Sequence, residues 1–264
     1  MCMTTQILND LTVEIDGEGA ALLCIHGLGG SSNNWTPILP ALGRFRRIRP
    51  DLPGSARSPL PADGQALSIK YYVETMTLLF STLDIGSVHV MAHSMGTIVA
   101  QHLALRRPGT VKSLALFGPM AAPPEAARPN IMARANAARG GVAAMQEIAD
   151  AIVKGATSTQ TKEQQPAVLA LVRESVMRQS PEGYAQSCAA LAEAQSAELE
   201  RIDVPTLLVT GDQDGVAPAV NVRTMQERIA GSRLVVLEGC GHWTTFEQPQ
   251  RCAQELEAFY AALP

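Results

Sequence analysis

Aromatic residues, charged residues and cysteines are all scarce in this 264-residue sequence. Only 4% of the residues are aromatic and 17% are charged, and the formal net charge is −4. A nucleic-acid partner is not expected, because phosphate binding needs a cluster of Lys and Arg that the sequence does not contain. No apolar run approaches the ~20 residues that a membrane-spanning helix needs, so we expect no membrane association.

The five cysteines are widely separated, with no C-x-x-C pair and no histidine at metal-ligand spacing; they are Cys2, Cys24, Cys188, Cys240 and Cys252. This usage is typical of reduced thiols in a cytoplasmic protein, and it indicates no metal site. Residues 1–10 lack the basic start and the apolar core of a signal peptide, which agrees with a cytoplasmic location.

Short apolar, β-branched segments alternate with segments of helical periodicity. We expect a hairpin over Gln6–Ile15, then strands at Ala21–His26, Arg46–Pro50, Ser87–Ala92, Val111–Phe117, Pro205–Thr210 and Arg233–Leu237. We expect helices at Asn34–Leu42, Ile69–Leu83, Met95–Arg106, Ala219–Ile229 and Gln248–Ala262. This alternation predicts an α/β fold, in which a mostly parallel central sheet of about eight strands carries helices on both faces.

The alternation is interrupted once, between Met120 and Arg201. This stretch is rich in Ala, Gln and Glu, shows helical periodicity between prolines and glycines, and contains no strand pattern. We therefore expect residues 1–119 and 202–264 to form the core domain and residues 120–201 to form a helical cap inserted between two strands. A cap over the carboxyl ends of the strands would close the crevice where open α/β sheets bind ligands.

Ser94 lies between an expected strand and an expected helix, in A-H-S-M-G at Ala92–Gly96. A nucleophile on a sharp strand-to-helix turn needs small residues two positions before and two positions after it, and both are small here. Free N–H groups at the start of the following helix favour developing negative charge. We predict that Ser94 is a nucleophile and that the Met95 N–H is one oxyanion donor.

A serine hydroxyl becomes a good nucleophile only when a base removes its proton, and the base needs an acid that orients it. His242, in G-C-G-H-W after the last expected strand, is the candidate base. The segment T-G-D-Q-D-G, at the end of an earlier strand, supplies two candidate acids, Asp212 and Asp214.

Taken together, these segments resemble the α/β-hydrolase fold family. The similar segments are H-G-L-G-G at His26–Gly30, D-L-P-G-S-A-R-S at Asp51–Ser58, A-H-S-M-G at Ala92–Gly96, G-D-Q-D at Gly211–Asp214 and G-H-W at Gly241–Trp243. The resemblance implies the order Ser, Asp, His along the chain, assigns the acid to Asp214, and places the second oxyanion donor at the Leu28 N–H. Ala92 departs from the family pattern, which usually has glycine there.

The resemblance implies a serine hydrolase that cleaves a small carboxylic ester or lactone through an acyl-enzyme, without a metal or organic cofactor. Ser180–Leu191, S-P-E-G-Y-A-Q-S-C-A-A-L, is similar to bacterial 3-oxoadipate enol-lactonases, so an enol-lactone is the leading specific substrate. Met120, Met132 and Arg134 are the candidate substrate-binding residues. A carboxylate on the substrate would need a cation, and the cap offers Arg128, Arg134, Arg139, Arg173 and Arg178.

Other functions fit the same residues. A meta-cleavage C–C bond hydrolase and a general carboxylesterase share the Ser, Asp, His arrangement, and some receptors for small molecules keep it with slow turnover. No motif indicates an oligomeric state. We expect structural roles for four nearby residues: His26 should bind loop backbone, His93 should point away from the cleft, Asp51 should tie the turn after it, and Cys240 should be a buried thiol.

Overall fold

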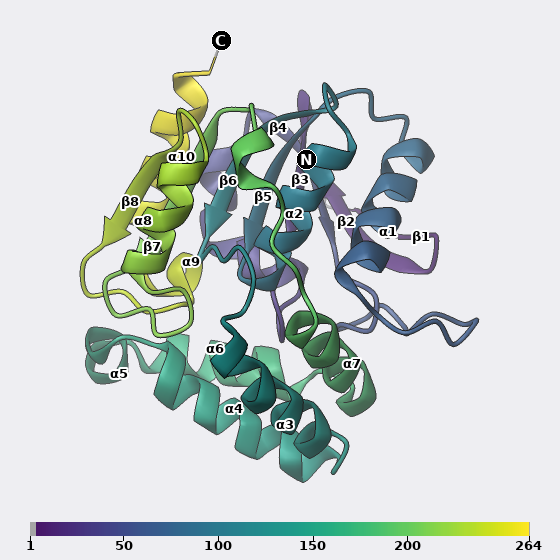
Figure 1. Cartoon of the computed structure of the whole chain (residues 1–264), viewed down its shortest axis with the longest axis vertical. Helices are drawn as coiled ribbons and strands as arrows, with labels where there is room; N and C mark the ends of the chain where they lie inside the picture. Colours follow the sequence, from purple (N-terminus) through teal and green to yellow (C-terminus); the bar gives the residue numbers. More distant parts are fainter. Residues whose placement is uncertain (1–3, 264) are drawn as a thin grey trace.

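The centre of the computed structural model, which describes residues 4–263, is one sheet (Figure 1). It consists of β1 (Thr4–Leu8), β2 (Leu11–Asp16), β3 (Ala20–Ile25), β4 (Phe45–Pro50), β5 (Val88–His93), β6 (Val111–Phe117), β7 (Thr206–Gly211) and β8 (Arg233–Leu237). The spatial order is β1-β2-β4-β3-β5-β6-β7-β8, in which β1 and β2 pair antiparallel and the strands from β4 to β8 run parallel. The expected mostly parallel sheet is confirmed.

Both faces of the sheet are buried because apolar side chains point alternately to its two sides. In β3, Leu23 and Ile25 join the cluster on one face, whereas Leu22 and Cys24 join the cluster on the other. Three helices pack on the first face and two on the second. The helices on the first face are α1 (Ile69–Thr82), α2 (Met95–Arg106) and α8 (Ala219–Arg228). The helices on the second face are η1 (Ser32–Leu42) and α10 (Pro249–Ala261). The short helix α9 (Thr244–Glu247) comes directly before α10.

The helix expected at Asn34–Leu42 is present but has 3₁₀ geometry, and it begins at Ser32. Pro37 and Pro40 lie inside it. Proline has no N–H to donate, so two bonds of an α-helical ladder would be missing, and a tighter turn results.

The connection between β6 and β7 is a helical insertion. Its elements are η2 (Glu125–Ala127), α3 (Arg128–Ala138), α4 (Val142–Ala156), α5 (Thr159–Gln164), α6 (Pro166–Met177), α7 (Pro181–Ala192) and η3 (Leu199–Arg201). In Figure 1 the helices α3 to α7 lie together at one end of the sheet, at the foot of the view. Their own apolar cluster also contains Trp243 and Phe246 from the core, so the insertion packs directly on the segment that follows His242.

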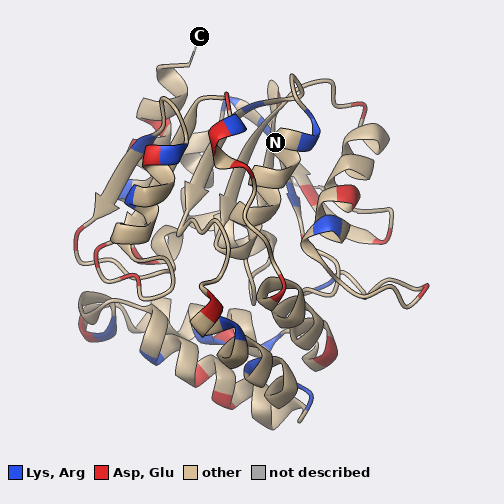
Figure 2. Ribbon diagram, viewed as in Figure 1, with Lys and Arg blue, Asp and Glu red and all other residues tan. Residues whose placement is uncertain are grey.

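Charged residues of both signs occur on the core and on the insertion, and the strands at the centre of the view carry few of them (Figure 2). Within residues 4–263, no helix is long and apolar enough to cross a membrane. Cys24, Cys188, Cys240 and Cys252 are free and buried, as expected for reduced thiols, while Cys2 lies outside the described residues.

Candidate active site

Ser94 occupies a strained turn between β5 and α2. Its φ of 53° and ψ of −125° lie in a region that non-glycine residues seldom adopt, at a cost of about 1–3 kcal/mol. Gly96 makes the turn possible, because a Cβ at this position would lie 2.5 Å from the His26 carbonyl oxygen and 2.6 Å from that of Ile25. The turn therefore lifts the hydroxyl out of the strand and leaves no room for a side chain two positions later.

The structure brings Ser94, His242 and Asp214 into one hydrogen-bonded line. His242 Nε2 lies 2.9 Å from Ser94 Oγ, and His242 Nδ1 lies 2.8 Å from Asp214 Oδ2. All three side chains are buried. The serine follows β5, the aspartate follows β7 and the histidine follows β8, so the groups come from three loops at the carboxyl ends of parallel strands.

Asp214 is held by its own loop as well as by His242. Its Oδ1 accepts hydrogen bonds from the Val216 N–H at 2.8 Å and the Ala217 N–H at 2.7 Å. Burial raises the pKa of Asp214, but the His242 ring and these two amides together outweigh burial and hold the pKa at about 2. Asp212 does not contact His242; its carboxylate accepts from the Cys240 N–H at 3.1 Å.

The loop that carries His242 is fixed from two sides. The His242 carbonyl accepts a hydrogen bond from His93 Nε2 at 2.8 Å, and the His242 N–H donates to the Ala156 carbonyl of the insertion at 2.9 Å. Burial, with the nearby His242 ring, lowers the pKa of His93 to about 3, so His93 is neutral at physiological pH. This contact confirms a structural role for His93, which holds the backbone of His242, the candidate base.

Gly118, the residue after β6, leaves the space that the His242 ring occupies. A Cβ on Gly118 would lie 2.8 Å from Cε1 and 2.9 Å from Nδ1 of His242. No sequence pattern predicts this role for Gly118, because a glycine before a proline at the end of a strand indicates only a turn.

Glu247 joins the His242 loop to the insertion and was also missed. Its buried carboxylate accepts from the N–H groups of Gly241 at 3.0 Å and Trp243 at 3.1 Å. From the insertion it accepts the Ser158 N–H at 2.8 Å and the Thr161 hydroxyl at 2.9 Å. One carboxylate thus satisfies four donors, two on each side of the boundary between core and insertion.

Two backbone amides near Ser94 are free to hold an anion. Within residues 4–263, neither the Leu28 N–H nor the Met95 N–H donates to a protein acceptor. The Met95 N–H is free because it opens α2, where the first amides have no partner in the helix. Gly27, next to Leu28, is so close to the serine that a Cβ on it would lie 2.6 Å from Ser94 Cβ.

His26 sets the direction of the Leu28 amide. Its Nε2 accepts from the Leu52 N–H at 2.9 Å, so Nδ1 carries the ring proton and donates to the Gly27 carbonyl at 2.8 Å. The Gly30 N–H donates to the same carbonyl at 3.0 Å. Because C=O and N–H point in opposite directions across a trans peptide, fixing the Gly27 oxygen also fixes the Leu28 N–H. The expected binding of His26 to loop backbone is confirmed.

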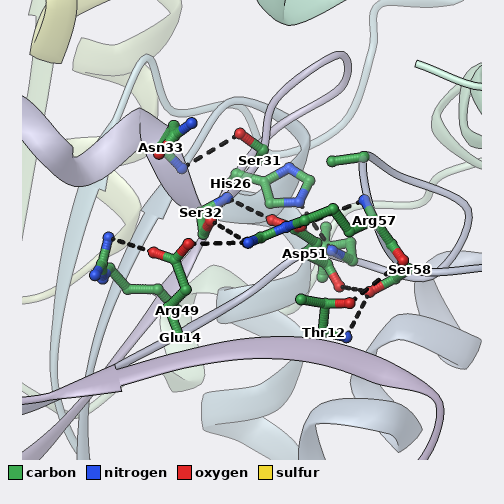
Figure 3. Close-up of polar contacts among 12 residues, drawn as sticks. Thr12, Glu14, His26, Ser31, Ser32, Asn33, Arg49, Asp51, Arg57 and Ser58 are labelled. Carbon is green, nitrogen blue, oxygen red and sulfur yellow. Dashed lines mark hydrogen bonds and ion pairs between the residues drawn. The ribbon is translucent and has the colours of Figure 1, made fainter. Parts of the chain in front are cut away.

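An ionic network of buried carboxylates and the partly exposed Arg57 packs next to this loop (Figure 3). Asp51 accepts from the Ser32 N–H at 2.7 Å and from Arg57 Nε at 2.7 Å, and Arg57 also contacts Glu14 at 3.0 Å. Burial raises the pKa of the Asp51 carboxyl, but the bonds from Arg57 and Ser32 outweigh burial and lower it. Asp51 ties the turn after it, as predicted, through the Arg57 N–H, and it also ties the loop after β3.

The three candidate substrate-binding residues lie in different surroundings. The backbone of Met120 bonds to the side chains of Thr97 and Gln101 on α2. Met132 on α3 has a side chain that is 36% exposed. Arg134, two residues further along α3, lines a cavity of about 560 Å³ between α3, α4 and the loop that carries Asp214. In the part of the chain that the structure describes, no three His, Cys, Asp or Glu side chains are grouped to hold a metal ion.

Comparison with known proteins agrees with this architecture. Residues 20–249 match the family described as alpha/beta hydrolase fold. Over 268 residues the chain is 25% identical to (E)-2-((N-methylformamido)methylene)succinate hydrolase of Acinetobacter baylyi. This match covers 99% of this chain and 98% of that protein. Over 256 residues it is 28% identical to 2-hydroxymuconate semialdehyde hydrolase of a Pseudomonas species, and this match covers 93% of this chain and 88% of that protein. The enol-lactonase from Burkholderia xenovorans superimposes with a TM-score of 0.87 and 28% identity, covering 98% of this chain and 100% of that one.

Proposed function

The chain belongs to the alpha/beta hydrolase fold family, and from this membership we propose that it is a serine hydrolase acting on a small carboxylic ester or lactone. The observation that carries the proposal is the line of contacts from Ser94 Oγ to His242 Nε2 and from His242 Nδ1 to Asp214 Oδ2. A buried hydroxyl, imidazole and carboxylate in this order form the arrangement that activates a serine.

In the proposed reaction, Ser94 Oγ forms a bond to the carbonyl carbon while its proton passes to His242 Nε2. The imidazolium then gives this proton to the alkoxy oxygen, the C–O bond breaks, and an acyl-enzyme remains. Water repeats the sequence, with His242 again taking a proton, and releases the carboxylic acid and the free serine. Asp214, whose pKa is about 2, stays ionised and stabilises the imidazolium at each step.

The negative charge that develops on the carbonyl oxygen would be held by the Leu28 and Met95 N–H groups. Both are without an acceptor within residues 4–263, and His26 fixes the orientation of the first. Donors that are already oriented need no reorganisation during the reaction, and removing one such donor costs about 10²–10³-fold in kcat. Apart from the attacking water, all the groups that this chemistry uses belong to the protein. We propose that the reaction takes place in the cytoplasm.

An enol-lactone is our leading specific substrate. The similarity to the Burkholderia xenovorans enol-lactonase supports it, at 28% identity over 98% of this chain. The relative from Acinetobacter baylyi is named as a hydrolase of a substituted succinate. The relative named as 2-hydroxymuconate semialdehyde hydrolase supports a second candidate, hydrolysis of a C–C bond next to a carbonyl group.

The test is a substrate panel on the purified protein and its Ser94→Ala variant. We expect an enol-lactone and short p-nitrophenyl esters to be hydrolysed, a vinylogous diketone to be cleaved more slowly, and Ser94→Ala to lower kcat by about 10⁵-fold or more. Ser196→Ala is the control, because the one hydrogen bond that its hydroxyl forms among residues 4–263 is to the Ala197 carbonyl beside it. Full hydrolytic activity in Ser94→Ala, or a phosphonate probe bonded to another side chain, would refute the proposal. Preference for the diketone would favour the C–C bond hydrolase, and binding with turnover far below ~0.1 s⁻¹ on every compound would favour a receptor.

A further inference from the structure

The arginines of the helical insertion differ in what their guanidinium groups contact. Four of them are either bonded within the protein or exposed to solvent. Arg128 donates to the carbonyls of Ala192 and Ala194, Arg139 pairs with Glu182 at 3.1 Å, Arg173 pairs with Asp150 at 2.6 Å, and Arg178 is exposed. Arg134 is the exception, because it is mostly buried and no carboxylate among residues 4–263 forms an ion pair with it.

The neighbours of Arg134 do not neutralise its charge. They are the Tyr184 phenol and the Cys188 thiol of α7, and burial raises the pKa of both groups, so both stay neutral at physiological pH. Burial lowers the pKa of Arg134, but these two neighbours outweigh burial and raise it. Arg134 Nε is buried without a hydrogen-bond partner among the described residues. Arg134 therefore stays charged, and an anionic ligand would supply the counter-ion that it lacks among residues 4–263.

Tyr184 connects this cation to the loop that carries the oxyanion donor. Its ring packs on Gly29, where a Cβ would lie 3.4 Å from Tyr184 Cε2. Its hydroxyl is buried and has no partner in the part of the chain that the structure describes. Gly29 is two residues from Gly27, which touches Ser94, and two residues span at most ~7 Å. Tyr184 therefore packs on the loop after β3 that carries Gly27 and the Leu28 N–H.

A cavity next to Arg134 offers space for a ligand. The cavity of about 560 Å³ that Arg134 lines is bounded mainly by apolar side chains of α3 and α4, among them Ala137, Ile148, Ile152 and Ala156. Its opposite wall contains Gly215 and Val216, which directly follow Asp214. Arg134 is the only basic side chain in the lining and the exposed Glu147 is the only acidic one.

We propose that Arg134, assisted by the Tyr184 hydroxyl, binds a carboxylate on the substrate, so that the enzyme acts on esters or lactones of short dicarboxylic acids. This inference rests on the proposed function, which it narrows to one substrate class. A guanidinium matches the two oxygens of a carboxylate, the phenol can donate a further hydrogen bond, and the apolar walls suit a short hydrocarbon chain between the two acid groups.

The experiment compares two esters that differ in one charge, monomethyl glutarate and dimethyl glutarate. In the Arg134→Gln variant we expect KM for the monoester to rise about 10- to 100-fold, the range that loss of a charged hydrogen bond produces, while KM for the diester changes little. Tyr184→Phe should raise KM for the monoester less, by roughly 3- to 10-fold. Arg139→Gln is the matched control at the C-terminal cap of α3, because its partner is the exposed Glu182.

Calorimetric titration with glutarate gives a second readout that does not depend on turnover. Glutarate should bind the wild type and Ser94→Ala, and it should bind Arg134→Gln at least tenfold more weakly; thermal melting verifies that each variant is folded. Equal KM values for the monoester in the wild type and Arg134→Gln, or equal glutarate binding, would overturn the assignment. If Ser94→Ala hydrolyses both esters normally, the proposed function fails, whereas Arg134-dependent glutarate binding would still support the carboxylate site.

Discussion

The catalytic groups of the core and the proposed ligand-binding groups of the insertion differ in how completely they are bonded. In the core, the acid and base of the site have partners on every side: Asp214 accepts from two amides and from His242, and the His242 backbone is held at both its N–H and its carbonyl. In the insertion, Arg134 and Tyr184 each keep a buried polar atom without a partner among residues 4–263. In our proposal, the core is therefore prepared for the bond-breaking steps before any ligand arrives, whereas the ligand supplies the missing partners of Arg134 and Tyr184.

Replacing Asp214 with Asn should produce the largest loss of activity, because Asp214 orients the catalytic base in the core. An amide cannot hold the imidazole in the required tautomer, so kcat for an ester should fall about 10⁴-fold. Asp212→Asn is the matched control two residues away, and it should change kcat little because Asp212 contacts the Cys240 amide and not His242. Steady-state kinetics measure both, and equal losses would contradict the assignment of the acid to Asp214.

Gly118→Ala tests how tightly the core holds its base. The added methyl would lie 2.8–2.9 Å from two atoms of the His242 ring, so the ring must move away from Ser94. A displacement of ~1 Å costs about 10²-fold in kcat. Gly231→Ala separates this contact from backbone strain: Gly231 also has a positive φ, of 70°, but nothing lies within 4 Å of an added Cβ. A kcat loss of the same size in both variants would show that strain alone is responsible.

Glu247→Gln tests the boundary between the two regions. The amide would place an N–H group against donors that now share one carboxylate, and we expect the free energy of unfolding to fall by about 2–3 kcal/mol. The corresponding decrease in Tm is about 5–10 °C for a chain of this size. Glu257→Gln, at an exposed position of α10, is the control. An unchanged Tm in Glu247→Gln would mean that the apolar contacts and the other hydrogen bonds between core and insertion, such as that from the His242 N–H to the Ala156 carbonyl, are sufficient to hold the two regions together.

The smallest expected effect concerns the response of the core to acid. The folded-state pKa of Asp214, about 2, lies below its unfolded value, so its ionisation stabilises the folded protein above the unfolded pKa, and this stabilisation is lost as pH falls from ~4 through ~2. It amounts to about 2 kcal/mol. Denaturant unfolding of the wild type and Asp214→Asn should therefore show a difference in stability that shrinks over this range. A difference that stays constant from pH 5 to pH 2 would contradict the lowered pKa.

The core was largely predictable because its signals are local. Each buried strand has alternating or continuous apolar residues that determine its faces, and the A-H-S-M-G turn is dictated by the space around Ser94 and Gly96. The expected strands were confirmed, with ends shifted by one or two residues. The geometry of η1 was the main local difference, and its two prolines were the available signal.

The parts that escaped prediction depend on contacts between distant segments. Five arginines of the insertion look alike in sequence, and only their folded surroundings distinguish Arg134 from Arg139 or Arg173. Gly118 and Glu247 matter because of where the His242 loop lies relative to β6 and α5, which no pattern within either segment specifies. Met120 and Met132 remain predictions as substrate-binding residues, because nothing in their contacts decides the matter.

The pairing of β6 with β7 has a consequence for how such a protein diversifies. The two strands are neighbours in the sheet and pair through residues such as Leu114 with Thr206 and Phe117 with Val209, although more than 80 residues of chain separate them. None of these ladder contacts involves the intervening helices. A different set of helices could therefore be grafted between the same two strands to change which molecules are accepted, as long as it also supplied the carbonyl that holds the His242 N–H, which here belongs to Ala156.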